Sequence, residues 1–292
     1  MQRIAALEQE ISVAVTGART TEDVFTGQPH WMPSGRIFGG QVVAQALRAA
    51  EYTIDDDRPA HSLHAYFLRP GDTGAPLTYS VDRIHDGRSF STRRTQAYQD
   101  GVPILSMIAS FQHRDDTDAF QTPMPEDIPD PEELPTIAEL TAGLPDGADV
   151  TWARERPVDV RHVGGPIYLS VSGDRVPHQA VWMRANTKLP DSLSVQRAAL
   201  AYASDLSLLE PILRGLGVPW ATPGLKIASL DHVLWFHRDG RVDDWLLYVQ
   251  EATSAVSSRG LAHGRFYTRD GVHIASVAQE GLVRVPRRTP SS

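Results

Sequence analysis

One aspartate stands out chemically because the sequence around it is almost entirely apolar. Residues 195–210 (VQRAALAYASDLSLLE) carry apolar side chains at three- and four-residue steps, which predicts one helix that ends at Pro211. The other faces of this helix are largely apolar too, so we expect it to be buried. Asp205 then lies at the edge of the apolar stripe, where a carboxylate is costly unless it is paired or hydrogen-bonded. It is either a partly exposed residue or a group retained for chemistry.

The two halves of the chain match each other at nearly constant offset. The matches are Ser62-Leu63 with Ser229-Leu230, Arg93 with Arg259, and Asp100-Gly101-Val102 with Asp270-Gly271-Val272. The offsets stay between 166 and 170 residues and the matches keep one order along the chain. We therefore infer two copies of one helix-plus-sheet unit.

The two copies differ in their polar residues. The first predicted helix, at residues 41–50, carries no carboxylate, and at the offset of 170 residues Gln279 corresponds to Ala109. Ser229 begins a predicted strand, and Gln279 lies near the end of the last one. Each of these two residues alone could be an ordinary polar residue of a strand. Together with Asp205 they indicate one polar site in the second copy, and we expect the corresponding place in the first copy to be a packed remnant.

The elements that must position these residues follow from the apolar patterning. Residues 1–19 predict an amphipathic helix, and residues 24–25 a strand. Further strands are expected at 61–68, 76–83, 89–99 and 102–111, and then at 157–163, 180–185, 226–236, 244–252, 258–268 and 272–284. A helix as apolar as those expected here must be enclosed, and a curled antiparallel sheet does that. We predict an α+β double hotdog, in which two helix-wrapped antiparallel sheets join edge to edge into one continuous sheet.

The sequence divides into three parts. Residues 1–113 form the N-terminal hotdog with its leading helix, and residues 151–286 form the C-terminal hotdog with the candidate catalytic residues. Between them, residues 114–150 are an acidic, proline-rich linker. Within 114–146 there are six prolines and ten acidic residues against the single base Arg114, and one short helical turn is expected near 137–140. We expect a solvated connector without chemistry.

Composition excludes several classes of function. The 292 residues carry a formal net charge of −8, which disfavours general nucleic-acid binding. The chain has no cysteine, so thiolate catalysis, disulfides and zinc–sulfur sites are excluded. No stretch approaches 18 uninterrupted apolar residues, and the N-terminus lacks the pattern of a signal peptide. We expect no membrane span and a cytoplasmic protein.

Six separated blocks resemble the type II acyl-CoA thioesterases and keep that family's order. They are RIFGGQVVAQAL (36–47), HSLHAYFLRPGD (61–72), VWMRAN (181–186), LAYASDLSLLEP (200–211), ASLDHVLWFHR (228–238) and DGVHIASVAQEGLVR (270–284). The resemblance implies a double-hotdog fold and hydrolysis of medium- or long-chain fatty acyl-CoA, without metal or bound cofactor. It places the family's catalytic Asp, hydroxyl residue and Gln on Asp205, Ser229 and Gln279. The family often has Thr where this chain has Ser229, so positioning of the hydroxyl is expected to be looser.

The mechanism that we expect uses water as the nucleophile. Asp205 would accept a proton from that water, while Ser229 and Gln279 hold both in line. The Gly39-Gly40 turn is the candidate oxyanion donor. Candidate residues for the CoA nucleotide are Arg69, Arg88, Arg93, Arg94 and Arg284.

Two other functions stay open at this point. One is a hotdog enoyl-CoA hydratase, although that chemistry pairs an Asp with a nearby His and Asp205 has no His within a helical turn. The other is a non-catalytic acyl-CoA-binding protein. Pairing of sheets between double units makes a homodimer or homotetramer the expected assembly.

Overall fold

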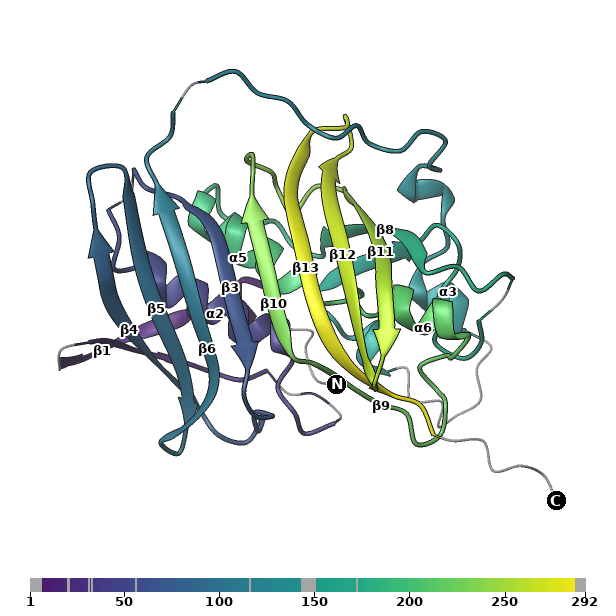
Figure 1. Cartoon of the computed structure of the whole chain (residues 1–292), viewed down its shortest axis with the longest axis horizontal. Coiled ribbons are helices and arrows are strands. Elements are labelled where there is room, and N and C mark those ends of the chain that lie inside the picture. The colour runs from purple at the N-terminus through teal and green to yellow at the C-terminus, as the bar shows by residue number, and fades with distance from the viewer. Residues whose placement is uncertain are drawn as a thin grey trace.

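The described strands all join one antiparallel sheet that wraps two central helices (Figure 1). The computed structural model describes residues 7–19, 22–30, 32, 34–55, 57–115, 117–142, 151–171 and 173–286. The sheet has 13 strands, ordered β1-β2-β4-β5-β6-β3-β10-β13-β12-β11-β8-β7, with β9 paired to β13. The predicted double hotdog is confirmed.

The first copy begins with short elements and continues with a helix and four strands, of which β4, β5 and β6 pair in sequence and β3 pairs with β6. Its elements are α1 (Leu7–Ile11), β1 (Val13–Arg19), β2 (Asp23–Gly27), α2 (Gly39–Glu51), β3 (Ala60–Phe67), β4 (Leu77–Asp86), β5 (Phe90–Gln99) and β6 (Val102–Gln112). Two short helices follow in the intervening segment, η1 (Pro131–Glu133) and α3 (Ile137–Thr141), the second where a helical turn was predicted.

The second copy repeats this plan with an added helix. Its elements are α4 (Thr151–Arg154), β7 (Val158–His162), β8 (His178–Ala185), α5 (Leu193–Ser204), α6 (Glu210–Leu216), β9 (Lys226–Ser229), β10 (Asp231–Phe236), β11 (Leu246–Val256), β12 (Arg259–Thr268) and β13 (His273–Arg284). The two copies join where β3 pairs with β10, with Leu63 opposite Leu234. Because both leucines are fully buried, the joint belongs to the core that the copies share.

Helices α2 and α5 pack against each other through small side chains. Their buried alanines are Ala44, Ala46, Ala49 and Ala50 in α2, and Ala198, Ala199, Ala201 and Ala203 in α5. The helices run antiparallel, because the start of α2 lies against Tyr202 near the end of α5, while Glu51 at the end of α2 hydrogen-bonds Ser194 at the start of α5. Each end of the pair therefore brings one helix start beside one helix end.

Two predicted elements were wrong in their bounds, and one predicted helix end was wrong. The helix expected over 195–210 is two helices, because α5 ends at Ser204 and α6 begins at Glu210. Pro211 does not end a helix but sits in the first turn of α6, where its missing N–H costs nothing. The strand expected over 226–236 is interrupted at Leu230, which separates β9 from β10.

The N-terminal prediction was also wrong for most of its length. Of the helix expected over 1–19, only α1 (Leu7–Ile11) is helical among the described residues, and residues 1–6 lie outside them. Val13 begins strand β1, which pairs with β2 at the sheet edge. Edge pairing outweighs the helical spacing of a few apolar residues, because β-branched side chains fit a strand well.

The acidic segment after β6 is more than a solvated connector. It crosses to the second copy, as the teal trace above the sheet in Figure 1 shows. Met124, Ile128 and Leu134 pack against a second cluster that contains Trp182 and Leu247. The Trp182 indole N–H also donates to the Pro129 carbonyl at 2.9 Å. The segment thus covers an apolar patch on the second copy, which the sequence did not predict.

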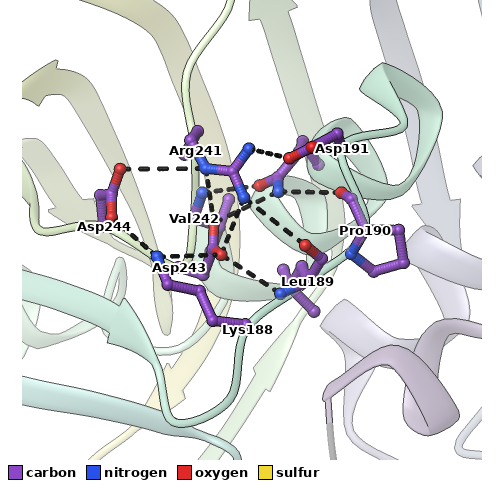
Figure 2. A network of polar contacts seen from close by, with 9 residues as sticks. Lys188, Leu189, Pro190, Asp191, Arg241, Val242, Asp243 and Asp244 are labelled. Atoms are coloured by element: carbon purple, nitrogen blue, oxygen red, sulfur yellow. Dashed lines mark hydrogen bonds and ion pairs between the residues drawn. The ribbon is translucent and has the colours of Figure 1, made fainter.

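A polar network secures the start of α5 (Figure 2). The buried Asp243 accepts hydrogen bonds from Arg241, from the Leu189 N–H and from Gln196 of α5. Burial alone would raise the pKa of Asp243, but these bonds outweigh it and lower the pKa to about 2. The carboxylate is ionised at neutral pH and joins the loop before α5 to the turn before β11. None of the described helices is long and apolar enough to span a membrane.

Candidate active site

The three candidate catalytic residues lie within hydrogen-bond distance of one another. Asp205 is the C-terminal cap of α5, Ser229 ends β9, and Gln279 lies on β13. Ser229 Oγ donates to Asp205 Oδ1 at 3.0 Å. Gln279 Nε2 donates to the same oxygen at 2.7 Å and contacts Ser229 Oγ at 2.5 Å. One carboxylate oxygen therefore receives two donors, and the second remains for another partner.

A buried histidine, His232 on β10, orients the Gln279 amide. His232 Nδ1 lies 3.1 Å from Gln279 Oε1, and its Nε2 lies 2.8 Å from Ser204 Oγ. Because Oε1 can only accept, Nδ1 carries the proton, while the Ser204 hydroxyl lies within hydrogen-bond distance of both Nε2 and the Ala201 carbonyl. Burial lowers the pKa of His232, which favours this neutral form. The histidine thereby holds the amide so that its N–H groups face Asp205 and Ser229.

The start of α2 reaches the same carboxylate from the other copy. The Gly40 N–H hydrogen-bonds Asp205. A Cβ on Gly39 would lie 2.8 Å from Asp205 Oδ2, so only glycine admits this approach. Phe38, the N-terminal cap of α2, has no side-chain capping bond, and the Gly39 N–H has no partner among the described residues. The positive end of the helix is thus directed at the site.

Opposing effects act on the proton affinity of Asp205. Burial raises its pKa, and this is the largest effect. The hydrogen bonds from Gln279, Ser229 and Gly40 oppose it, but the pKa stays above its ordinary value. A carboxylate with a raised pKa is a stronger base than an exposed aspartate.

A cavity of about 800 Å³ opens beside the carboxylate, within the usual range for ligand pockets. Asp205 and Ser229 line it, whereas the fully buried Gln279 lies behind them. Apolar side chains from both copies form much of its wall, among them Ile37, Phe67, Leu209 and Leu225. The cavity therefore belongs to the joint between the copies and not to either copy alone.

Most of the predicted arginines lie elsewhere. Only Arg69 of the five lines this cavity. Arg93 is buried against Thr53 and Asp86, and Arg94 pairs with Asp82 on the exposed surface. The lining contains two arginines that the sequence analysis missed, Arg36 and Arg156. Arg36 opens the block 36–47, but nothing in that block marks the arginine as a ligand, and Arg156 lies outside the six blocks. Loops that are distant in sequence bring both arginines to the cavity.

This arrangement can prepare a water molecule for attack on a bound electrophile. It offers a buried base, two side chains that fix the base, and helix N–H groups beside an apolar cavity. Family profiles agree with both copies, since "Acyl-CoA thioesterase N-terminal domain" matches residues 28–112 and "Acyl-CoA thioesterase" matches residues 151–282. Human acyl-coenzyme A thioesterase 8 is 38% identical over 283 residues, covering 93% of this chain and 88% of the relative. The chain belongs to the acyl-CoA thioesterase family.

Other acyl-CoA thioesterases show the same likeness. Acyl-CoA thioesterase 2 of Haemophilus influenzae is 36% identical over 269 residues, which is 89% of this chain and 92% of the relative. The crystal structure of acyl-CoA thioesterase II TesB2 from Mycobacterium marinum superposes with a TM-score of 0.77 at 37% identity, covering 96% of this chain and 99% of that one. The predicted family is confirmed over nearly the whole chain.

In this thioesterase, His232 is the residue at the site that the sequence analysis missed. It follows Asp231 in a strand, and the sequence carries only one weak signal for it, its position three residues after Ser229. Residues three apart on one regular strand face opposite sides, but the break at Leu230 ends β9 and restarts the chain as β10. That break lets Ser229 and His232 both approach Gln279.

Proposed function

We propose that this thioesterase hydrolyses medium- or long-chain fatty acyl-CoA to a free fatty acid and CoA. The observation that carries the proposal is the convergence of Ser229 and Gln279 on one oxygen of Asp205 beside the apolar cavity. Asp205 takes a proton from water while the water oxygen bonds to the thioester carbonyl carbon. Collapse of the tetrahedral intermediate breaks the carbon–sulfur bond, and the thiolate takes up a proton. A thiolate is a good leaving group, so no strong acid is needed.

Other groups have supporting roles in this proposal. The Gly39 N–H stabilises the oxyanion, because the Gly40 N–H is already engaged with Asp205. The acyl chain lies along the apolar wall of the cavity, and Arg36, Arg69 and Arg156 hold the CoA phosphates. The three-part division at residues 1–113, 114–150 and 151–286, a homodimer or homotetramer, and a cytoplasmic location stay predictions.

The first test removes the base. We expect Asp205→Asn to lower kcat by about 10²- to 10⁴-fold, because an amide cannot take a proton from water. Release of CoA from a mid-length acyl-CoA is followed with a thiol reagent, and the absence of cysteine removes background from the protein. Near wild-type turnover in Asp205→Asn would reject the assignment, and turnover across graded chain lengths measures the acyl preference.

The same preparation separates the two alternatives. A hydratase would add water to crotonyl-CoA, which is measured by loss of the conjugated enoyl absorbance. His232 would have to serve that chemistry, but it is fully buried and bonded to Ser204 and Gln279. A binding protein without catalysis would show no CoA release from any chain length.

A further inference from the structure

A second cavity lies at the far ends of α2 and α5 from Asp205. Its volume is about 320 Å³, at the low end of ligand pockets. Three arginines line it, Arg48, Arg58 and Arg197, together with the carboxylates of Glu51 and Asp55. Positive charge thus exceeds negative charge among its lining residues.

Arg197 is the most buried of these cations and is incompletely compensated. Only 8% of the residue is exposed. Its Nη1 donates to the Ala60 carbonyl, and its Nη2 lies 3.3 Å from Asp239, a carboxylate that also pairs with Arg114. Its buried Nε has no hydrogen-bond partner among the described residues. This desolvated guanidinium shares the half-exposed Asp239 with Arg114 and shares Glu51 with Arg48, so its charge is only partly compensated.

The other two arginines are held beside it. Arg58 is fixed by hydrogen bonds to His113, the Gly87 carbonyl and Ser91, each at 2.8 Å. Arg48 lies 3.4 Å from Glu51 and donates to the Tyr52 hydroxyl at 3.2 Å. These bonds position the guanidinium groups before any ligand arrives, which reduces the entropic cost of binding one.

The cavity also receives the start of α5. Leu193 and Ser194, in the first turn, line it, and the N-terminal cap Ser192 makes no side-chain capping bond. Glu51 hydrogen-bonds Ser194, but burial raises the pKa of Glu51 to about 7 in spite of the nearby Arg48 and Arg197. The Glu51 carboxyl group is therefore only partly ionised at neutral pH. The start of α5 favours a ligand that carries a full negative charge.

This cavity is the counterpart of the active site under the internal repeat. Glu51 ends α2 beside the start of α5, just as Asp205 caps α5 beside the start of α2. The sequence analysis expected a packed remnant without a carboxylate, but α2 extends one residue beyond the predicted bound and includes Glu51. Ala109 takes the place of Gln279, so this end of the helix pair lacks the amide that would orient a base.

We propose that the cavity between the end of α2 and the start of α5 binds a phosphate group, as inorganic phosphate or a phosphomonoester, through Arg48, Arg58 and Arg197. A phosphate dianion accepts several guanidinium hydrogen bonds and offsets the surplus charge of the three arginines. The first copy would then carry an anion site at the end of α2, where the second copy carries the base Asp205 at the end of α5.

Phosphorus NMR at pH 8 and constant ionic strength tests the proposal, with inorganic phosphate and glycerol 3-phosphate as separate probes on the full chain. At this pH both Glu51 and the phosphate are mostly ionised. We expect saturable binding that Arg48→Gln weakens roughly tenfold, because it removes a charge-assisted donor. Glu51→Gln should strengthen binding roughly threefold or more, because it removes a competing negative charge.

Arg94→Gln is the control, since Arg94 pairs with Asp82 on the exposed surface and lines neither cavity. It should leave phosphate binding unchanged. Binding of inorganic phosphate alone or of both probes supports the site and shows whether an ester group is admitted. The proposal is overturned by absence of saturable binding, by unchanged binding in Arg48→Gln, by equal weakening in Arg94→Gln and Arg48→Gln, or by weaker binding in Glu51→Gln. If Arg48→Gln does not fold, the Glu51→Gln result decides.

Discussion

The two carboxylate oxygens of Asp205 have different partners, and this difference determines what the residue can do. Oδ1 receives Ser229 and Gln279, while Oδ2 faces the start of α2. Fixed donors on one oxygen hold the carboxylate still, and the remaining acceptor capacity is available to water. The residue is thus a positioned base, with burial raising its pKa and hydrogen bonds limiting the rise.

The pH dependence of hydrolysis should reveal this balance. The Ser229 hydroxyl donates to the carboxylate and lowers the pKa of Asp205, so Ser229→Ala should raise that pKa further. Because the base must be ionised, the acidic limb of the kcat profile should move to higher pH, in addition to a fall in kcat. The profile is measured by CoA release from pH 5 to 9. An acidic limb that moves to lower pH would contradict the assigned role.

His232 should act only through Gln279. In His232→Phe the amide loses the donor that fixes Oε1, so it can rotate away from Asp205. We expect kcat to fall about tenfold, as for loss of one buried hydrogen bond, with a smaller change in KM. His64→Phe, at an exposed position on β3, is the control. An unchanged kcat with unchanged stability would show that Gln279 needs no support from His232.

At the level of elements, catalysis depends on two helices that meet end to start. The start of α2 is bare, because Phe38 offers no capping side chain and Gly39 offers no Cβ. Helix α5 ends at Ser204, so Asp205 caps it and the chain turns toward α6. A continuous helix over 195–210 would have kept the carboxylate on the helix wall.

Gly39→Ala tests the close approach. Its Cβ would lie 2.8 Å from Asp205 Oδ2 and 3.0 Å from the Phe67 ring, so the carboxylate or the ring must move. We expect kcat to fall about tenfold or more, since small displacements of a catalytic group are costly. Alanine favours helix over glycine, so α2 itself should persist, as circular dichroism would show. Full activity would mean that the start of α2 has room that these distances do not leave.

At the scale of the whole molecule, the two copies share one sheet and one core. Strands β3 and β10 join them, and the catalytic cavity takes its walls from both. Neither copy can open without exposing the buried faces of α2 and α5. We therefore regard the double unit as one cooperative structure.

Unfolding by guanidinium should then be a single transition. Five of the six tryptophans, Trp152, Trp182, Trp220, Trp235 and Trp245, belong to the second copy, so fluorescence follows mainly that half. Far-UV circular dichroism follows the whole chain, and we expect its midpoint to coincide with that of fluorescence. Leu234→Ala, at the joint between the copies, should lower both midpoints together. We expect it to lower the free energy of unfolding by about 2–5 kcal/mol. Separated midpoints would show that the copies unfold independently.

Local patterns in the sequence determined much of this protein. Alternating strands, two apolar helices and a repeat offset of 166–170 residues were enough to predict the double hotdog, because burial leaves a short-range signature in residue types. The same comparison of copies selected Asp205 and Gln279, since the first predicted helix carries no carboxylate and Gln279 corresponds to Ala109. Ser229 corresponds to Ser62 and was chosen with them as a polar residue at the start of a strand.

Only the tertiary structure decided how these groups meet. Gln279 lies 74 residues from Asp205, and His232 reaches it through a strand break that no periodicity marks. The Gly40 contact and the arginines of both cavities depend on how α2 and α5 pack and on the register of β3 against β10. Periodicity tells which face of an element is buried, but it carries no information about which distant element lies against that face.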